Sequence, residues 1–175
     1  DWAEGWAGLG TMQTRSSLHE EGVLSYKKSL SLKINQPRVH LSLGHVYKTT
    51  GSQENSINSY KEAIHHDEDF GEAYWSLANL KTYKFNSDEL DEMEYRLSLK
   101  ELPERERVHF LFSLGKGYED IGEYEKSFEF YKQGNNLNRG RTSYDPKAIE
   151  AVSDRLKNYF TTEVFAKRKE CGFLS

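Results

Sequence analysis

The chain has 175 residues, of which 30% are charged and 13% aromatic, and its formal net charge is −4 at pH 7. This length suits one domain or one short repeat array, and the aromatic content distinguishes the chain from disordered sequences of similar polarity. Basic residues are spread along the sequence and no apolar run approaches the roughly 20 residues of a membrane span, so we expect neither a nucleic-acid nor a membrane partner.

The ends of the sequence give three further expectations. No charged-then-apolar leader opens the chain, which favours a cytoplasmic protein. The first residue is Asp1 and not methionine, so we interpret the sequence as a piece of a longer protein. Cys171 is the only cysteine, which rules out a disulfide within the chain, and nothing near it in sequence indicates a reactive thiolate.

A leucine followed by a small residue recurs along the chain. It appears at Leu9-Gly10, Leu43-Gly44 and Leu77-Ala78, 34 residues apart, and again 37 residues later at Leu114-Gly115. A bulky residue lies three positions before each leucine, on the same helical stripe: Trp6, His40, Tyr74 and Leu111. This spacing predicts four amphipathic helices, each opening one repeat unit.

Each unit also predicts a second helix. Tyr26, Tyr60 and Tyr131 share one repeat position, and a small residue lies four positions before each tyrosine: Gly22, Ser56 and Ser127. Small residues let the backbones of two antiparallel helices approach closely, so we expect Gly44 to face Ser56. Gly51 and Gly122 lie where the first helix of a pair has to end in a tight turn.

The third unit departs from this pattern. Lys81 and Glu94 occupy positions where the pattern usually has tyrosine or another aromatic residue. Its second helix is expected over residues 87–99, with an apolar stripe of Leu90, Met93 and Leu97. We place the three inserted residues near Lys100 to Pro103, which predicts a longer helix afterwards with Pro103 in its first turn.

A further helix is expected after the repeats. Asp145-Pro146 is typical of an N-cap followed by a first-turn proline. The helix that follows has one apolar face, formed by Ile149, Val152, Leu156 and Phe160. Because the last unit of a repeat array exposes an apolar face, we expect this segment to cover it as a capping helix.

The repeat register resembles the tetratricopeptide repeat family, whose 34-residue units show Trp-x2-Leu-Gly-x2-Tyr followed by small and aromatic positions. The resemblance covers residues 3–138. It implies an all-α, right-handed superhelical solenoid of four helix-turn-helix units plus capping helices. The corresponding ranges are 3–36, 37–70, 71–107 and 108–141 for the units, which form an array over 1–140, and 142–168 for the cap.

A more specific resemblance covers residues 70–172. The runs 70–85 and 106–120, together with Tyr131-Lys-Gln-Gly-Asn135 and residues 160–165, resemble the repeat region that precedes the sulfotransferase domain of bacterial repeat-containing sulfotransferases. This resemblance implies that residues 169–175 begin a linker to a downstream catalytic domain. That domain would use a sulfonucleotide donor, whereas this chain would hold no cofactor, no metal and no catalytic residue.

The family resemblance also implies a binding groove, because first helices line the concave surface of such repeats. It places nine side chains there: Arg38, His45, Lys48, Trp75, Asn79, Tyr83, His109, Phe112 and Lys116. A protein or peptide ligand would bury an apolar side chain against Trp75 or Phe112 while a lysine or arginine meets a carboxylate. The alternative is that Trp75 and Phe112 pack between neighbouring helices and the charges are only solvated.

Three functions follow. The first is a recruitment arm for a downstream sulfotransferase, and the second is a stand-alone adaptor or self-association module. The third is an enzyme that uses His45, His109 and Glu119 in the groove, which requires these side chains to converge. We reject a metal site at His65-His66, because adjacent helical residues point about 100° apart.

Overall fold

The computed structural model describes residues 2–99, 101–141 and 145–168. These residues form ten α-helices and no strand. The chain divides into two compact units, Asp1–Asn138 and Arg139–Ser175, which are described separately below. Within the described residues, no helix has both the length and the apolar character that crossing a bilayer requires.

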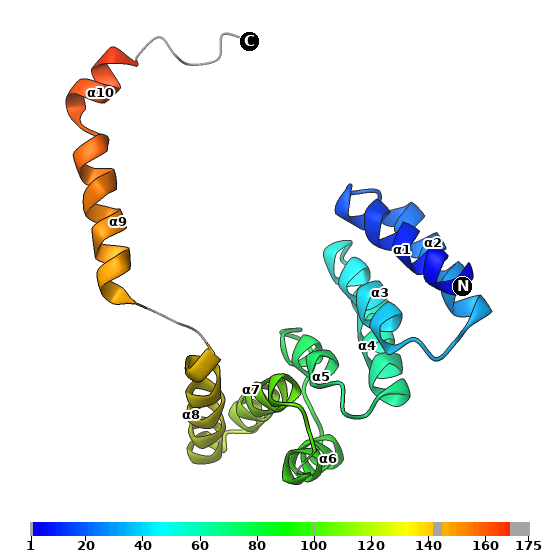
Figure 1. Ribbon diagram of the computed structural model, residues 1–175. Coiled ribbons are helices and arrows are strands. Elements are labelled where there is room, and N and C mark those ends of the chain that lie inside the picture. Colours follow the sequence, from blue (N-terminus) through cyan, green and yellow to red (C-terminus); the bar gives the residue numbers. More distant parts are fainter. Residues whose placement is uncertain (1, 100, 142–144, 169–175) are drawn as a thin grey trace. The chain divides into compact units, whose positions relative to one another are not determined.

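The first two repeats are pairs of packed helices. In the first, α1 (Trp2–Arg15) packs against α2 (His19–Leu32). In the second, α3 (Pro37–Thr49) packs against α4 (Gln53–His66), and α2 contacts α3, so the pairs stack in chain order (Figure 1). Gly51 lies in the turn after α3 with φ at 79°, a left-handed conformation that glycine adopts at least cost, as the sequence predicts.

The third repeat contains a first helix that is shorter than predicted. Helix α5 (Gly71–Ala78) has eight residues, and residues 79–86 lead without helical structure to α6 (Ser87–Ser98). Leu80 and Phe85 in this connection are buried in the core, which they reach because α5 ends early. The prediction that Tyr83 belongs to the first helix is therefore wrong, and Asn79 is the C-cap residue of α5.

The second helix of this repeat is confirmed. Asn86 and Glu89 form a capping box, in which each side chain accepts a hydrogen bond from the other residue's backbone N–H. Leu90 and Met93 are buried, and Leu97 packs beside them, as the apolar stripe predicts. The insertion assigned to the following turn includes Lys100, which lies outside the described residues.

The fourth repeat consists of α7 (Glu104–Asp120) and α8 (Tyr124–Arg141). With 17 residues, α7 is longer than the other first helices, as predicted. Pro103 is the N-cap residue of α7 and not part of its first turn, which corrects the sequence prediction by one position. Gly122 lies in the turn between the two helices with φ at 83°, again as predicted.

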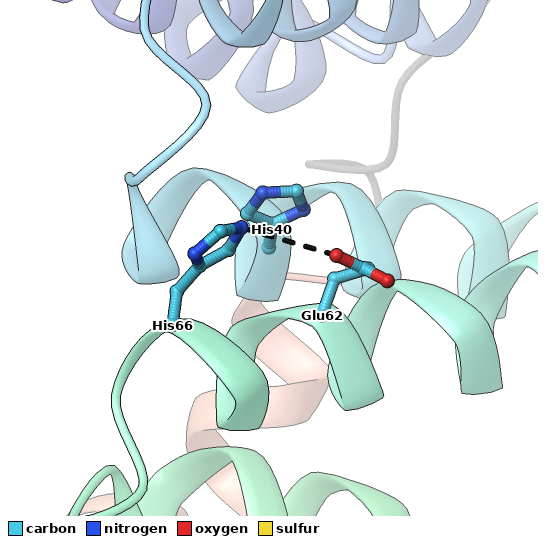
Figure 2. Close-up of side chains that lie close together, drawn as sticks. All are labelled: His40, Glu62 and His66. Carbon is cyan, nitrogen blue, oxygen red and sulfur yellow. Dashed lines mark ion pairs between the residues drawn. The ribbon is translucent and has the colours of Figure 1, made fainter.

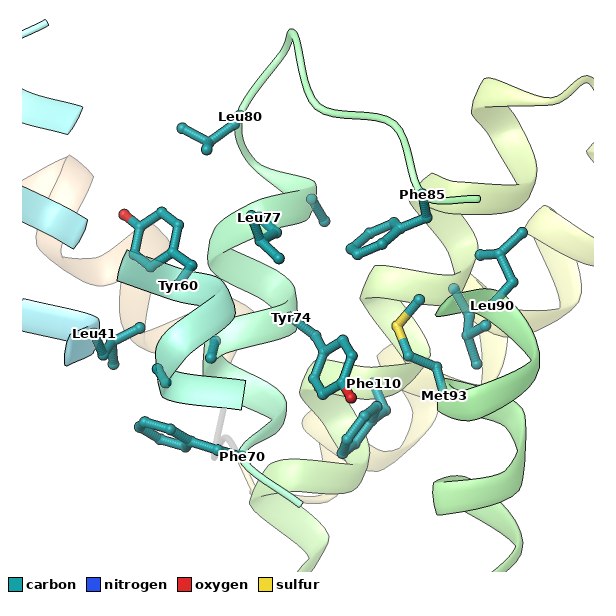
Figure 3. Packing of buried hydrophobic residues seen from close by; sticks show 14 of the residues in the cluster. Leu41, Tyr60, Phe70, Tyr74, Leu77, Leu80, Phe85, Leu90, Met93 and Phe110 are labelled. Atoms are coloured by element: carbon teal, nitrogen blue, oxygen red, sulfur yellow. The ribbon is translucent and has the colours of Figure 1, made fainter. Parts of the chain in front are cut away.

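The core runs through the second, third and fourth repeats. One cluster of buried side chains extends from Leu41 in α3 to Tyr118 in α7 (Figure 3). Tyr60 and Phe110 are fully buried in this cluster, which includes rings and aliphatic side chains of α4, α5, α6 and α7. A smaller cluster around Tyr26 joins the first two repeats. Each repeat therefore depends on its neighbours for burial.

The second unit contains α9 (Pro146–Tyr159) and α10 (Thr162–Lys167). The Asp145 side chain accepts a 2.9 Å hydrogen bond from the Lys147 backbone N–H, and Pro146 opens α9, so the predicted N-cap is confirmed. The predicted apolar face is exposed at Ile149, Val152 and Leu156 of α9 and at its C-cap residue Phe160. A capping role for this helix stays a prediction, and the proposed linker 169–175, with Cys171, lies outside the described residues.

Candidate functional site

In the second repeat, a contact between a serine and a glycine holds the two helices together. The Ser56 hydroxyl donates a 2.9 Å hydrogen bond to the Gly44 carbonyl, as the sequence led us to expect for this pair. A Cβ atom on Gly44 would lie 2.4 Å from the ring of Tyr60, so only glycine permits this close approach. The contact fixes α3 on α4 and thereby sets the direction of the α3 side chains.

Three aromatic side chains form a row across α5, α7 and α8. The ring centroids of Trp75 and Phe112 lie 5.6 Å apart, and those of Phe112 and Tyr131 lie 6.3 Å apart. All three rings are half-buried. Trp75 and Phe112 thus pack between neighbouring first helices and also present part of their surface to solvent, which combines the two alternatives left open by the sequence.

Tyr131 belongs to this row although sequence reasoning placed it only in a packing stripe of the second helix. Its hydroxyl donates a 3.1 Å hydrogen bond to Glu119, which orients the ring. Burial, followed by the neighbouring Glu119 carboxylate, raises the pKa of Tyr131 to about 12, so the hydroxyl stays protonated at neutral pH. The sequence signal for this contact was Phe112. It lies one helical turn before Lys116 on α7, the helix that α8 covers.

The three predicted groove residues of the second repeat have different surroundings. The Nδ1 atom of His45 lies 2.9 Å from the Tyr60 hydroxyl, which ties this side chain to α4. Lys48 is exposed. The Arg38 guanidinium lies 6.0 Å from the centroid of the Phe70 ring, in a pocket of about 230 Å³ that acidic residues also line. Arg38 thus already has an aromatic and an acidic environment within the chain.

Local polar contacts hold the remaining predicted groove residues in the third and fourth repeats. Lys116 pairs with Asp120 one turn further along α7. The Asn79 amide donates a 3.0 Å hydrogen bond to the Trp75 carbonyl. Tyr83 donates its hydroxyl proton to Glu89 and lies under Lys61, so it contacts α4 and α6 instead of extending the row of Trp75 and Phe112.

His109 is half-buried in α7, and its backbone carbonyl accepts a 2.8 Å hydrogen bond from the Ser113 hydroxyl. Among the described residues, one group of three His, Cys, Asp or Glu side chains brings its ligand atoms within 4.8 Å of one another, and it consists of His40, Glu62 and His66. His45, His109 and Glu119 form no such group. These three side chains therefore do not converge, as catalysis by them in the groove would require.

A pocket of about 550 Å³ lies among α6, α7 and α8. Its apolar lining consists of Leu97, Leu111, Phe130 and Leu137, and Arg107 lies at its polar side. The Arg107 guanidinium also donates to the carbonyls of Leu97 in the last turn of α6 and of Leu99, the C-cap residue of α6. None of the nine predicted groove residues lines this pocket, so the pocket was not found from the sequence.

Comparison with known proteins shows the class of fold. Residues 37–70, the second repeat, match the sequence model of the tetratricopeptide repeat family. Two solved structures of MamA superimpose with a TM-score of 0.60: one is 18% identical and covers 81% of each chain, and the other is 22% identical and covers 79% of this chain and 74% of that one. No curated protein matches the chain in sequence.

Two other solved structures have a similar fold. PilF of Pseudomonas aeruginosa is 17% identical, with a TM-score of 0.58, and the match covers 78% of this chain and 61% of PilF. BtubC from P. vanneervenii is 14% identical, with a TM-score of 0.60, and the match covers 82% of this chain and 66% of BtubC. These likenesses establish an all-helical solenoid of the tetratricopeptide type, and they give no support to the sulfotransferase-associated resemblance.

Proposed function

We propose that this chain, a tetratricopeptide-type solenoid by fold, is a scaffold that binds a protein or peptide through the row of Trp75, Phe112 and Tyr131. The observation that carries the proposal is the mutual contact of these rings on three helices while each keeps part of its surface exposed. Repeat solenoids of this kind present extended concave surfaces, and recognition is the usual role of such surfaces.

The physical advantage of the row is its rigidity. Trp75 packs on the main core cluster, and Tyr131 is held by Glu119, so little side-chain entropy remains to be lost when a ligand binds. Tryptophan and tyrosine are also enriched among the side chains that contribute most to binding energy. His109, three residues before Phe112 on α7, adds a polar group beside the rings.

A displayed library of random peptides tests this proposal. Clones selected on the wild-type protein are expected to lose at least about tenfold in affinity on Trp75→Ala and on Phe112→Leu, since an anchor that contributes 1.4 kcal/mol accounts for a factor of ten. Trp2→Ala is the matched control, because Trp2 is 83% exposed in α1 and lies outside the row. Equal binding to all variants would remove the row as the binding surface.

The finer proposal is that the scaffold is the recruitment arm of a sulfotransferase. Its support is the resemblance over residues 70–172, and the scaffold itself would need no cofactor. Reading the gene for about 40 codons beyond Ser175 tests it, because a phosphosulfate-binding loop requires an apolar strand followed by a basic loop that contains glycine and serine or threonine. An unrelated downstream sequence would contradict the link to a sulfotransferase and leave the adaptor role as the remaining proposal.

The adaptor alternative includes association with a second copy of the chain. A symmetric dimer would show twice the monomer mass by light scattering. The fraction of chains in the dimer would rise with protein concentration. Loss of that dimer on Trp75→Ala would assign the aromatic row to self-association. A constant monomer mass would leave an external protein or peptide as the ligand of the row.

A further inference from the structure

We propose that His40, Glu62 and His66 form a binding site for a divalent transition-metal ion of the zinc type. The site lies wholly within the second repeat and is separate from the aromatic row on α5, α7 and α8. His40 extends from α3, and Glu62 and His66 extend from α4 toward it (Figure 2). One ligand atom of each side chain lies within 4.8 Å of the other two.

The spacing on α4 places two ligands on one face. Glu62 and His66 are four residues apart, so they are neighbours one turn apart on the same helix, and the Glu62 Oε2 and His66 Nε2 atoms lie 3.9 Å from each other. This distance is too long for a hydrogen bond but matches two donors that flank a common cation. His40 completes the group from the opposite helix and stacks on His66, with ring centroids 5.0 Å apart.

The backbone fixes the orientation of His40. This residue is 6% exposed, and its Nε2 atom lies 3.1 Å from the carbonyl oxygen of Ile34. A carbonyl only accepts, so Nε2 carries the proton of the neutral ring and Nδ1 keeps the lone pair. Histidines that ligate metals commonly donate their other ring N–H to a backbone carbonyl in this way, which fixes the ring in place.

His66 gives a second, independent indication. Its Nε2 atom is buried and has no hydrogen-bond partner among the described residues. Buried polar atoms in proteins are nearly always satisfied, so an unsatisfied one needs a physical reason. A cation bonded to the Nε2 lone pair supplies that reason. The adjacent His65 is exposed and takes no part in the group, so the site is not the His65-His66 pair that the sequence analysis rejected.

The donor set selects the class of ion. Two imidazole nitrogens and one carboxylate oxygen suit zinc and its first-row neighbours, whereas calcium and magnesium prefer all-oxygen ligands. Bonds of about 2.0–2.1 Å require the donors to approach one another further. The Glu62 side chain, which is 56% exposed, has the freedom to make that movement. Three protein ligands leave a fourth position for water or for a side chain of a bound protein.

Calorimetric titration of metal-free protein with zinc chloride, after removal of any polyhistidine tag, tests the site. We expect one zinc ion per chain, with affinity reduced at least about tenfold in Glu62→Gln and in His66→Ala, since lost ligands cost metal affinity directly. His65→Ala is the matched control, because His65 neighbours His66 and lies outside the group, and it is expected to bind zinc as the wild type does.

Two further measurements keep the result interpretable. Circular dichroism checks that each variant folds, and Glu62→Gln is the safest variant because its side chain is largely exposed. Cobalt(II) substituted for zinc should give the intense visible absorption of a four-coordinate site with nitrogen and oxygen ligands in wild type and in His65→Ala only. Absence of saturable zinc binding, or equal weakening by His65→Ala and His66→Ala, would overturn the proposal.

Discussion

The hydroxyl of Ser56 donates a 2.9 Å hydrogen bond to the carbonyl of Gly44, across the two helices of the second repeat. The same contact recurs in the fourth repeat, where Ser127 donates to Gly115 at 2.7 Å. In the first repeat Gly22 occupies the serine position, and there the backbones of α1 and α2 approach without this bond. In these three repeats a small residue at this position permits the close approach, and the side chain itself differs.

Ser56→Ala should lower the free energy of unfolding by about 1 kcal/mol, because it removes one buried hydrogen bond and leaves a small void. Urea unfolding followed by circular dichroism measures the change. Ser31→Ala serves as the control, since Ser31 is exposed on α2, and its effect should stay within about 0.5 kcal/mol. A Ser56 effect no larger than that of Ser31 would show that the bond does not stabilise the helix pair.

Gly44→Ala should also destabilise the protein, although alanine normally stabilises a helix by about 1 kcal/mol relative to glycine. The added Cβ would lie 2.4 Å from the Tyr60 ring, and overpacking of this kind costs about 1–3 kcal/mol. Gly8→Ala in α1 is the matched control, because nothing lies within 4 Å of its Cβ position, and it should raise stability. Changes of the same sign in both variants would contradict the close-approach argument.

Much of this fold follows from spacing alone. The 34-residue register predicted the helix pairs, the contact of Gly44 with Ser56 and the left-handed turn at Gly51, because each depends on residues close in sequence or at a fixed offset. The early end of α5 was not predictable in this way. It depends on the burial of Leu80 and Phe85 in the core cluster, which is a tertiary effect that overrides helical periodicity.

The candidate metal site was missed for a related reason. His40 and His66 lie on different helices. From the sequence, the only histidines considered as metal ligands were the adjacent pair His65-His66, and His65 is exposed. The helical spacing of Glu62 and His66 was a readable signal, because residues four apart share one face. Its partner His40 had been assigned to the packing stripe that contains Tyr74 and Trp6. That stripe faces the neighbouring helix, and His40 therefore reaches His66.

Arg96→Ala should loosen the junction between the second and third repeats. The Arg96 guanidinium bonds to Glu92 at 2.5 Å on its own helix and also to Glu68 and Asp69 in the turn before α5, and its side chain is 17% exposed. Charge-assisted hydrogen bonds contribute about 1.5–3 kcal/mol, but the acidic partners are solvated, so we expect a loss of about 1 kcal/mol. Thermal unfolding measures it.

Lys157→Ala is the control for Arg96, because Lys157 forms a pair with Asp154 in which both side chains are at least 70% exposed. Such a pair should contribute almost nothing. High salt should reduce the difference between wild type and Arg96→Ala, since screening weakens the attraction that the variant removes. A loss in Arg96→Ala that is no larger than in Lys157→Ala would show that the junction does not depend on this arginine.

Stability should fall as the pH is lowered through the ordinary histidine range, and His45 should account for part of the fall. Burial, with Lys48 adding to it and Glu72 opposing it, holds the pKa of His45 below its usual value of 6.5. The folded chain therefore binds the proton less tightly than the unfolded chain does. Stability from neutral His45 is complete above that usual value and is lost as the pH falls toward the folded-state pKa.

His45→Gln removes this titration while keeping a polar side chain within reach of the Tyr60 hydroxyl. The difference in unfolding free energy between about pH 7.5 and about pH 5.5 should be smaller in His45→Gln than in wild type. His65→Gln is the matched control, because it makes the same histidine-to-glutamine change at another exposed helical position. If His45→Gln were as sensitive to acid as wild type, another group would carry the pH dependence.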